Sequence, residues 1–339
     1  MLDQHHPQIY RARALAAFVL KRVGRIVPFG AGTALLLLIS GCRTTPPTVA
    51  VIPRNCGTVL WEAEHTGVER EAAGRNVYVY WNGPMREDDV SAQIDVMTRA
   101  LARGARGLIV APVEALPLRA PVYSALQRGI PVVVVGTDVG LAPNKSLAYV
   151  LSDEQYGGQL AARRLGYLLH GHGTVALLGI SSQLSSTAER ARSVEDTLLR
   201  EYPDIHIVFR SMALPTTYQE QQVTERLLAK TAHLDAIVGL NETSTRGAFY
   251  ALTEFGRTQD VKLIGFDQDL LVPLHSGGMD AVIFQNTSKM GRAAVKLMDD
   301  ELHGAPAQRY VLIRPELVTR GNIDSPEVRE MLDLSWFNK

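Results

Sequence analysis

Cysteine is scarce in this 339-residue chain, and an excess of charge of either sign is absent. The two cysteines, Cys42 and Cys56, are too few for a disulfide framework, and no Cys/His group has the spacing of a zinc site. A single Cys42–Cys56 disulfide is one alternative; in the other, Cys56 is a free thiol. The 35 basic and 35 acidic residues cancel, whereas nucleic-acid binders carry a basic excess. The composition therefore excludes disulfide-rich scaffolds and predicts no nucleic-acid partner.

Motifs for nucleotide phosphates and for catalysis are also missing. No GxGxxG or GxxxxGK[ST] pattern follows an expected strand. No nucleophile stands beside a base, and no carboxylate pair with separated roles is visible. His170 and His172 have loop spacing and no further metal ligands nearby. We expect no catalysis, no cofactor and no metal.

The first residues are typical of an export signal. Basic residues up to Arg25 precede the uncharged stretch IVPFGAGTALLLLISG, which ends at Cys42. Ile39–Cys42 looks like a bacterial lipobox, in which the cysteine is acylated. We therefore expect a lipoprotein signal over 1–42, lipidation at Cys42, a tether over 43–47 and a location in the periplasm or cell envelope. The alternative is a plain transmembrane anchor.

From Thr48 onward, short apolar runs alternate with helical patterns. Runs such as Val132–Val135 lack polar alternation, which is typical of parallel strands covered by helices on both faces. Helices are expected at Val90–Arg103 and, after the cap Ser152-Asp153, at Glu154–Leu169. The pattern predicts an α/β fold with two doubly wound parallel sheets. The strands expected are Thr48–Ile52, Asn76–Tyr80, Gly107–Ala111, Pro131–Val135, Thr174–Gly179, Ile205–Phe209, Ala236–Gly239, Lys262–Phe266 and Asp280–Phe284.

Polar and aromatic side chains follow these strands, at the edge where open α/β sheets bind ligands. Planar hydrogen-bonding groups suit sugar hydroxyls, and an aromatic plane, best supplied by Trp61, suits the C–H face of a sugar ring. The pattern predicts a site for a small polar ligand. The positions that follow strands include Arg54, Thr58, Thr137, Asp138, Arg190, Asn241, Asp267 and Gln285.

The chain resembles the type-1 periplasmic binding proteins of the ribose/galactose-binding class, which serve sugar ABC transporters. The similarity runs from about Val49 to Asp324. The segments that carry it are VAVIPRNCGTVLWEAEHTGVE, WNGPMREDDVSAQIDVM, ARGLIVAPVEA, GIPVVVVGTD, SDEQYGGQLAARRL, AERARSVEDTL, IVGLNETSTRGAFYAL, KLIGFDQ, AVIFQNTSKMG and ELVTRGNID.

The resemblance implies roles for particular side chains. Arg190, Asn241, Asp267 and Gln285 match positions that hold sugar hydroxyls, and Trp61 matches one that stacks on the ring. Arg54 and Thr58 match polar positions of the first loop. Ribose-binding relatives carry Asp-Arg where this chain has Gly136-Thr137, with Asp138 one place later. This departure weakens the expectation of hydroxyl contacts from Thr137 and Asp138.

Each assignment has a structural alternative. Asp267 could cap the following helix, and Arg190 could pair with Glu189 or Glu195 on its own helix. Asn241 could be an ordinary helix start. Trp61 could belong to the core.

The resemblance also implies a division of the chain. Lobe one is expected to comprise 48–152 and 286–314, and lobe two 153–285 and 315–325, with three hinge segments and a tail over 326–339. The expected protein is a monomer that passes a sugar or polyol to a permease and its ATPase. The alternative is presentation of the ligand to a histidine kinase or chemoreceptor. A DNA-binding regulator with the same lobes needs an N-terminal helix-turn-helix, and the signal-like segment occupies that place.

Overall fold

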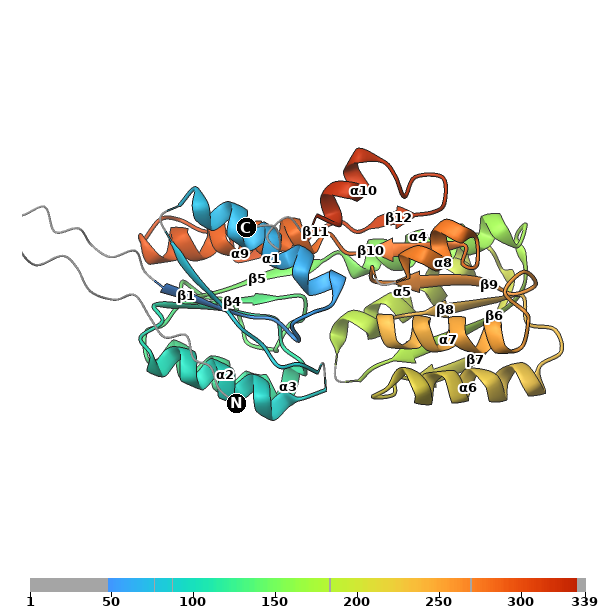
Figure 1. Ribbon diagram of the computed structural model, residues 1–339, viewed down its shortest axis with the longest axis horizontal. Helices are drawn as coiled ribbons and strands as arrows, with labels where there is room; N and C mark the ends of the chain where they lie inside the picture. The colour runs from blue at the N-terminus through green and yellow to red at the C-terminus, as the bar shows by residue number, and fades with distance from the viewer. Residues whose placement is uncertain (1–47, 76, 87, 183, 269, 334–339) are drawn as a thin grey trace, which may run out of the picture. The chain divides into compact units, whose positions relative to one another are not determined.

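The computed structural model describes residues 48–75, 77–86, 88–182, 184–268 and 270–333. Strands and helices alternate along most of this range (Figure 1). The strands are β1 (Thr48–Ile52), β2 (Tyr78–Trp81), β3 (Gly107–Val110), β4 (Val132–Val135), β5 (Leu147–Ser152), β6 (His172–Ile180), β7 (Asp204–Met212), β8 (Ala236–Gly239), β9 (Lys262–Phe266), β10 (Ala281–Phe284), β11 (Tyr310–Ile313) and β12 (Glu316–Val318). The helices are α1 (Val59–Ala73), α2 (Val90–Ala102), α3 (Ala115–Gln127), α4 (Glu154–Leu168), α5 (Ser185–Glu201), α6 (Thr217–Lys230), α7 (Glu242–Glu254), α8 (Leu271–Ser276), α9 (Thr287–Leu302) and α10 (Pro326–Met331).

The strands form two sheets of six. The first sheet has the order β11-β5-β4-β3-β1-β2, and all its pairings are parallel. The second sheet has the order β12-β10-β9-β8-β6-β7, with β12 antiparallel to β10 and the other pairings parallel. The predicted α/β fold with two parallel-dominated sheets is confirmed.

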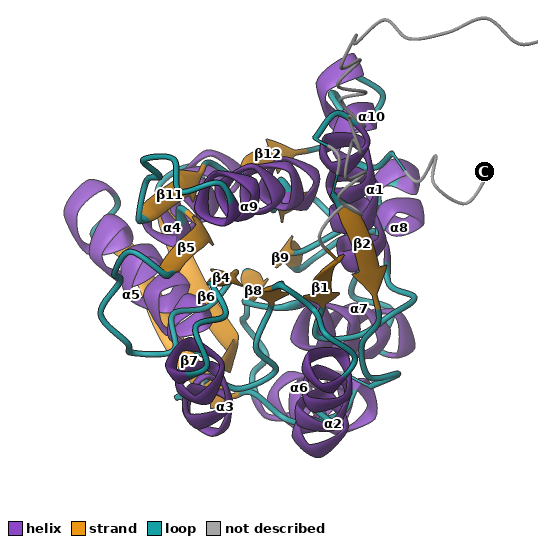
Figure 2. Cartoon of the chain, turned by 90° about the vertical axis from the view of Figure 1, so that its left-hand side faces the viewer, coloured by secondary structure: helices purple, strands orange, loops and turns teal. Residues whose placement is uncertain are grey.

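Helices cover both faces of each sheet, which explains the unbroken apolar runs. In β1, Val49 and Val51 pack on the side of α1 and α9, whereas Ala50 and Ile52 pack on the side of α2 and α3. In the second sheet, α4 and α5 cover one face, and α6, α7 and α8 cover the other. Figure 2 shows this layering, with strands between helices. A strand buried on both faces needs no polar alternation.

Helix starts follow the sequence signals. The side chain of Asp89 accepts a hydrogen bond from the backbone N–H of Ala92 and caps α2. Asp153 accepts from the N–H of Tyr156 at 3.0 Å and caps α4, as its position before Glu154 predicts.

Within the residues that the structure describes, the chain passes between the two sheets at three places. These are the connections from β5 to α4, from β10 to α9 and from β11 to β12. Two of them are bonded to each other, because the N–H of Asp153 donates to the carbonyl of Ile313 at 2.9 Å. The strands β5, β11 and β12 are additions to the nine that the sequence pattern indicates.

Candidate ligand-binding site

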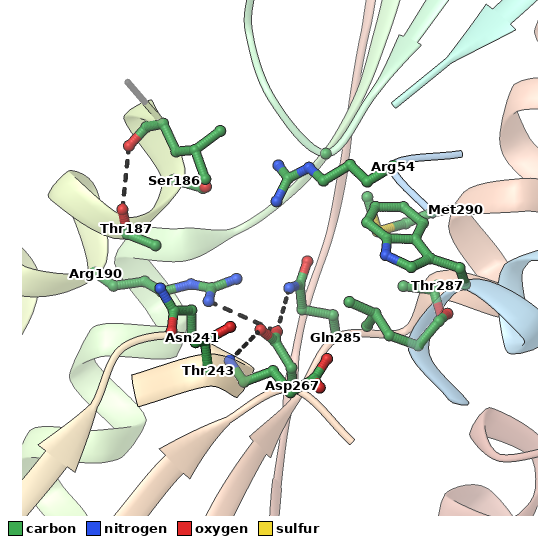
Figure 3. A pocket seen from close by; sticks show the side chains of 15 residues that line it. Arg54, Ser186, Thr187, Arg190, Asn241, Thr243, Asp267, Gln285, Thr287 and Met290 are labelled. Carbon is green, nitrogen blue, oxygen red and sulfur yellow. Dashed lines mark hydrogen bonds and ion pairs between the residues drawn. The ribbon is translucent and has the colours of Figure 1, made fainter. Parts of the chain in front are cut away.

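One cavity lies at the carboxyl ends of strands from both sheets (Figure 3). Its wall combines polar groups of both sheets' loops with an indole ring and a few apolar side chains. The lining residues are Arg54, Leu60, Trp61, Gly136, Leu184, Ser186, Thr187, Arg190, Asn241, Glu242, Thr243, Asp267, Gln285, Thr287 and Met290. The structure thus brings together six residues selected from the sequence: Arg54, Trp61, Arg190, Asn241, Asp267 and Gln285.

Asp267 lies at the centre of the second sheet's contribution. It directly follows β9, is only 7% exposed, and has a φ of 72°, in the left-handed region that few non-glycine residues adopt. Its Oδ1 accepts a hydrogen bond from Nε2 of Gln285, and its Oδ2 accepts from the N–H of Glu242 at 3.2 Å. These contacts hold a strained backbone in place, a pattern that is common at binding sites. The carboxylate caps the start of α7. The alternative drawn from the sequence was that Asp267 caps the helix that follows it along the chain, which is α8.

Arg190 is held by a carboxylate from another helix. Its Nε and Nη2 donate to the two oxygens of Glu154 at 2.5 and 3.0 Å, and its Nη1 donates to the carbonyl of Leu240 at 2.7 Å. Nη1 also lies 3.6 Å from Oδ1 of Asp267. The guanidinium stacks over the ring of Phe266, 4.5 Å from its centroid. Among the described residues, these contacts stand in place of the alternative pairing with Glu189 or Glu195 on its own helix.

Burial and charge act in opposite directions on this ion pair. Burial raises the pKa of Glu154 above its ordinary value, and the adjacent Arg190 opposes that rise. Burial alone would lower the pKa of Arg190, but Glu154 and Asp267 raise it above its ordinary value. The guanidinium therefore stays charged inside the wall, with its charge compensated by protein carboxylates.

Asn241 begins α7 and faces the cavity. Its Oδ1 accepts from the N–H of Ser244 at 2.8 Å, and the hydroxyl of Ser244 accepts from the N–H of Asn241, which forms a capping box. Gly179 makes room for this arrangement. It has a φ of 86°, and a Cβ there would lie 2.4 Å from Oγ of Ser244. Asn241 is thus both a helix start and part of the cavity wall.

The first sheet contributes an aromatic and a cationic side chain. Trp61, in the first turn of α1, is 4% exposed and belongs to the core as well as to the cavity wall. The guanidinium of Arg54 lies 5.6 Å from the centre of the indole ring. Its Nε donates to the carbonyl of Pro112 at 2.8 Å, and its Nη2 donates to the hydroxyl of Thr137 at 2.6 Å. A place in the core and a place in the cavity wall are therefore compatible for Trp61.

Three residues selected from the sequence do not line this cavity. Thr137 is buried and accepts the hydrogen bond from Arg54. Asp138 accepts from the N–H of Gly140 and from the hydroxyl of Tyr310. The hydroxyl of Thr58 donates to Asn55 at 3.4 Å. The structure thus gives these side chains protein partners, and their contact with a ligand stays a prediction. Cys42 lies outside the described residues.

Several cavity residues were not predicted from the sequence. Ser186 and Thr187 lie in the first turn of α5, after β6, and Thr243 lies in the first turn of α7. The strand-end rule that selected Asn241 would also have selected these hydroxyls. Glu154, behind Arg190, is the first residue of α4, and the sequence does not show that its side chain reaches α5.

Other features lie outside this site. Among the described residues, no three His, Cys, Asp or Glu side chains are grouped to hold a metal ion. In that part of the chain, no helix is both long and apolar enough to cross a membrane. Cys56 is a free thiol there. Burial and the neighbouring Glu62 raise its pKa, which makes it a weak nucleophile.

Residues 49–306 match the family described as the periplasmic binding protein domain, which spans most of the chain. The chain belongs to the periplasmic binding protein family. This is a family of binding proteins, and the two-sheet fold and the cavity between strand ends agree with that membership.

Curated relatives of this periplasmic binding protein cover most of its length. It is 28% identical over 245 residues to a putative rhizopine-binding protein of Rhizobium meliloti, which covers 70% of this chain and 78% of that protein. It is 24% identical over 304 residues to the ribose import binding protein of Bacillus subtilis. That match covers 85% of this chain and 97% of the Bacillus protein.

Solved structures show the same fold. A solute-binding protein of an ABC transporter from Agrobacterium vitis, bound to α-D-tagatopyranose, has a TM-score of 0.78 at 21% identity and covers 84% of this chain and 98% of its own. The periplasmic component of a sugar transport system from Hahella chejuensis has a TM-score of 0.73 at 26% identity. It covers 80% of this chain and 99% of its own.

Proposed function

We propose that this chain captures a sugar or a related polyhydroxylated small molecule in the cavity and delivers it to an ABC importer. The membrane partners in that process are a permease and its ATPase. The ligand-binding residues in this proposal are Arg54, Trp61, Arg190, Asn241, Asp267 and Gln285, with Ser186, Thr187 and Thr243 as further hydroxyl partners.

The observation that carries the proposal is the convergence of fixed polar groups beside one indole face. Asp267 is an acceptor held in place by Gln285 and by the N–H of Glu242. Asn241 supplies an amide, and Trp61 supplies an aromatic surface in the same cavity. A sugar presents hydroxyls that both donate and accept, together with an apolar C–H face. The donor and acceptor set therefore fits a polyhydroxylated ring better than a purely apolar solute.

The relatives support transport over sensing. Three of them are import proteins: a ribose import binding protein of Bacillus subtilis and D-apiose import binding proteins of Paraburkholderia graminis and Actinobacillus succinogenes. Other relatives bind xylitol or D-allose. These ligands are all polyhydroxylated and uncharged, which favours the same class for this chain.

Family membership implies a periplasmic location, and the proposal adds a lipid anchor at Cys42. The support is the lipobox-like Ile39–Cys42 after a basic and apolar segment. Acylation there would hold the protein at the membrane beside its permease. Cys42→Ala should move the protein from the membrane fraction to the soluble fraction of cells. An unchanged distribution would contradict the anchor.

A thermal-shift screen of the chain from Arg43 onward tests the proposed ligand class. A ligand that binds only the folded protein raises the melting temperature. We expect at least one of D-ribose, D-allose, D-apiose, xylitol and myo-inositol to raise it in a concentration-dependent way. No shift with any sugar or polyol, at concentrations up to the millimolar range, would contradict the proposal.

A further inference from the structure

The guanidinium of Arg190 has a fork of two parallel N–H donors, and protein atoms already accept from both. Its Nε and Nη2 donate to the two carboxylate oxygens of Glu154, and its Nη1 donates to the carbonyl of Leu240. Figure 3 shows the side chain of Arg190 in the cavity wall. The side chains of Arg190 and Glu154 are 3% and 5% exposed. A guanidinium binds a carboxylate best through two parallel N–H donors. Glu154 takes that face, so a carboxylate on a ligand cannot.

The packing of α4 on α5 keeps Glu154 in this place. A Cβ on Gly158 of α4 would lie 2.8 Å from the carbonyl of Arg190 and 2.5 Å from Cβ of Ser193. The hydroxyl of Ser193 donates to the carbonyl of Gln155 at 2.5 Å. The absence of a side chain at Gly158 lets the two helices approach closely. Glu154, one turn before Gly158, therefore reaches the buried guanidinium.

Glu154 also balances the charge of the cavity. The charge of Arg190 is cancelled by Glu154, and Glu242 pairs with Arg246 at 2.7 Å. The remaining charged groups of the lining are one carboxylate, Asp267, and one guanidinium, Arg54. With Glu154 in place the formal charges sum to zero, and without it the wall would carry a net positive charge.

We infer that Glu154 is a specificity-determining residue that restricts the cavity to uncharged polyhydroxylated ligands and excludes sugar acids. The inference rests on the proposed function and adds to it the charge class of the ligand. Glu154 acts through Arg190: it occupies the fork that a carboxylate would use, and it removes the positive charge that would attract one. A ligand carboxylate would be a third one beside Asp267 and Glu154. With the donors of Arg190 already taken, burying it there would be strongly unfavourable.

The test is a set of calorimetric titrations of the wild type and of Glu154→Gln. The neutral ligands are D-allose and xylitol. The acids are D-alluronate, which keeps the pyranose ring of D-allose, and D-xylonate, which keeps the open chain of xylitol. We expect the wild type to bind at least one neutral ligand at least about 100-fold more tightly than the matching acid. In Glu154→Gln only Asp267 is left beside Arg190, and the cavity wall carries a net positive charge. The affinity ratio of acid to neutral ligand should therefore rise at least about tenfold.

Glu201→Gln is a matched control. Glu201 of α5 accepts two hydrogen bonds from Arg163 of α4, at 2.9 and 3.0 Å, so it joins the same two helices with the same two-pronged geometry. That pair is solvent-exposed and does not line the cavity. The ratio should not change in this variant. Glu154→Asp, which keeps the negative charge, should still exclude acids even if its overall affinity falls.

The outcomes separate the inference from the proposed function. Wild-type binding of a neutral ligand with an unchanged ratio in folded Glu154→Gln overturns only the inference. Should Glu154→Gln fail to fold, the wild type still decides: binding of an acid as tightly as its neutral counterpart overturns the inference. Binding of neither class by the wild type contradicts the proposed function and the inference together.

Discussion

The side-chain amide of Gln285 donates a hydrogen bond to Oδ1 of Asp267, and the two residues follow the neighbouring strands β10 and β9. The second oxygen of Asp267 accepts from the N–H of Glu242 at the start of α7. The carboxylate is thus oriented before any ligand arrives. Pre-orientation lowers the entropy that binding would otherwise cost. The same contacts fix a buried acidic group at a residue with a strained φ.

Replacement of Asp267 by Asn should weaken ligand binding. The variant loses the negative charge and turns one acceptor into a donor, which faces the amide of Gln285 or the N–H of Glu242. We expect a loss of about 2–5 kcal/mol in binding free energy, or at least about thirtyfold in Kd. Isothermal titration with the sugar found in the thermal screen measures it.

Asp235→Asn is the control for that substitution. Asp235 precedes β8, at the opposite end of the same sheet, and its Oδ2 accepts from the N–H of Thr174 at 2.7 Å. This variant should lose stability and keep its affinity. Equal affinity loss in the two variants would mean that the effect of Asp267→Asn comes from the fold and not from the cavity.

Trp61 should report ligand binding by fluorescence. Its ring lies in the cavity wall, whereas the ring of Trp81 stacks on His65 with centroids 4.2 Å apart and does not line the cavity. Trp61→Phe should remove most of the ligand-induced change in tryptophan emission, and Trp81→Phe should retain it. The reverse pattern would place the ligand away from the indole of Trp61.

Gly67 should be essential to the contact between α1 and α9. A Cβ at this position would lie 2.0 Å from the carbonyl oxygen of Ser288. Gly67→Ala forces the helices apart, and we expect a loss of about 1–3 kcal/mol in the free energy of unfolding. It should also weaken binding, because Trp61 and Met290 reach the cavity from these two helices. Urea denaturation and titration measure the two effects.

Gly74, at the end of α1, supplies the comparison. A Cβ there would meet its nearest neighbour, the carbonyl of Glu71, at 3.6 Å, and the φ of −84° suits any residue. Gly74→Ala should therefore be neutral or should stabilise the protein by up to about 1 kcal/mol. Similar destabilisation by both alanine variants would contradict the close-contact explanation.

Glu64 should make stability depend on pH. It is 1% exposed, and its Oε2 has no hydrogen-bond partner among the described residues. Burial raises its pKa to about 8, and the charge of Arg54 opposes that rise. The unfolded chain releases this proton near pH 4.5, whereas the folded protein keeps it up to about pH 8. The free energy of unfolding therefore falls as the pH rises through this window.

Glu64→Gln isolates that effect, because other titrating groups are common to both proteins. We expect the variant to gain stability relative to the wild type between about pH 5 and pH 8, by at most about 1.4 kcal/mol per pH unit. The gain should level off above about pH 8. Urea denaturation across this range measures it, and parallel stability curves would contradict the raised pKa.

The sequence was a good guide to the strands and to the strand ends that bear polar groups. Buried runs such as Val132–Val135 are apolar because both faces are covered, so their interpretation as parallel strands required no knowledge of the partners. The strands β5, β11 and β12 were not predicted. For β11 and β12 the reason is that Arg314-Pro315 interrupts them and neither has a strong pattern.

Side-chain partners were predicted less well. The structural alternative for Arg190 placed its carboxylate partner on its own helix, at Glu189 or Glu195, but the partner is Glu154, 36 positions earlier. That pairing depends on how closely α4 approaches α5, which one sequence does not show. The orientation of Asp138 toward Tyr310 is likewise a rotamer choice made by the folded surroundings.

The decisive experiment for the proposed site is a crystal structure of the complex with the best ligand from the thermal screen. We expect a single sugar or polyol against the indole of Trp61, with hydroxyls within hydrogen-bond distance of Asp267, Asn241 and Gln285. A ligand bound at another surface, with this cavity containing only solvent, would contradict it.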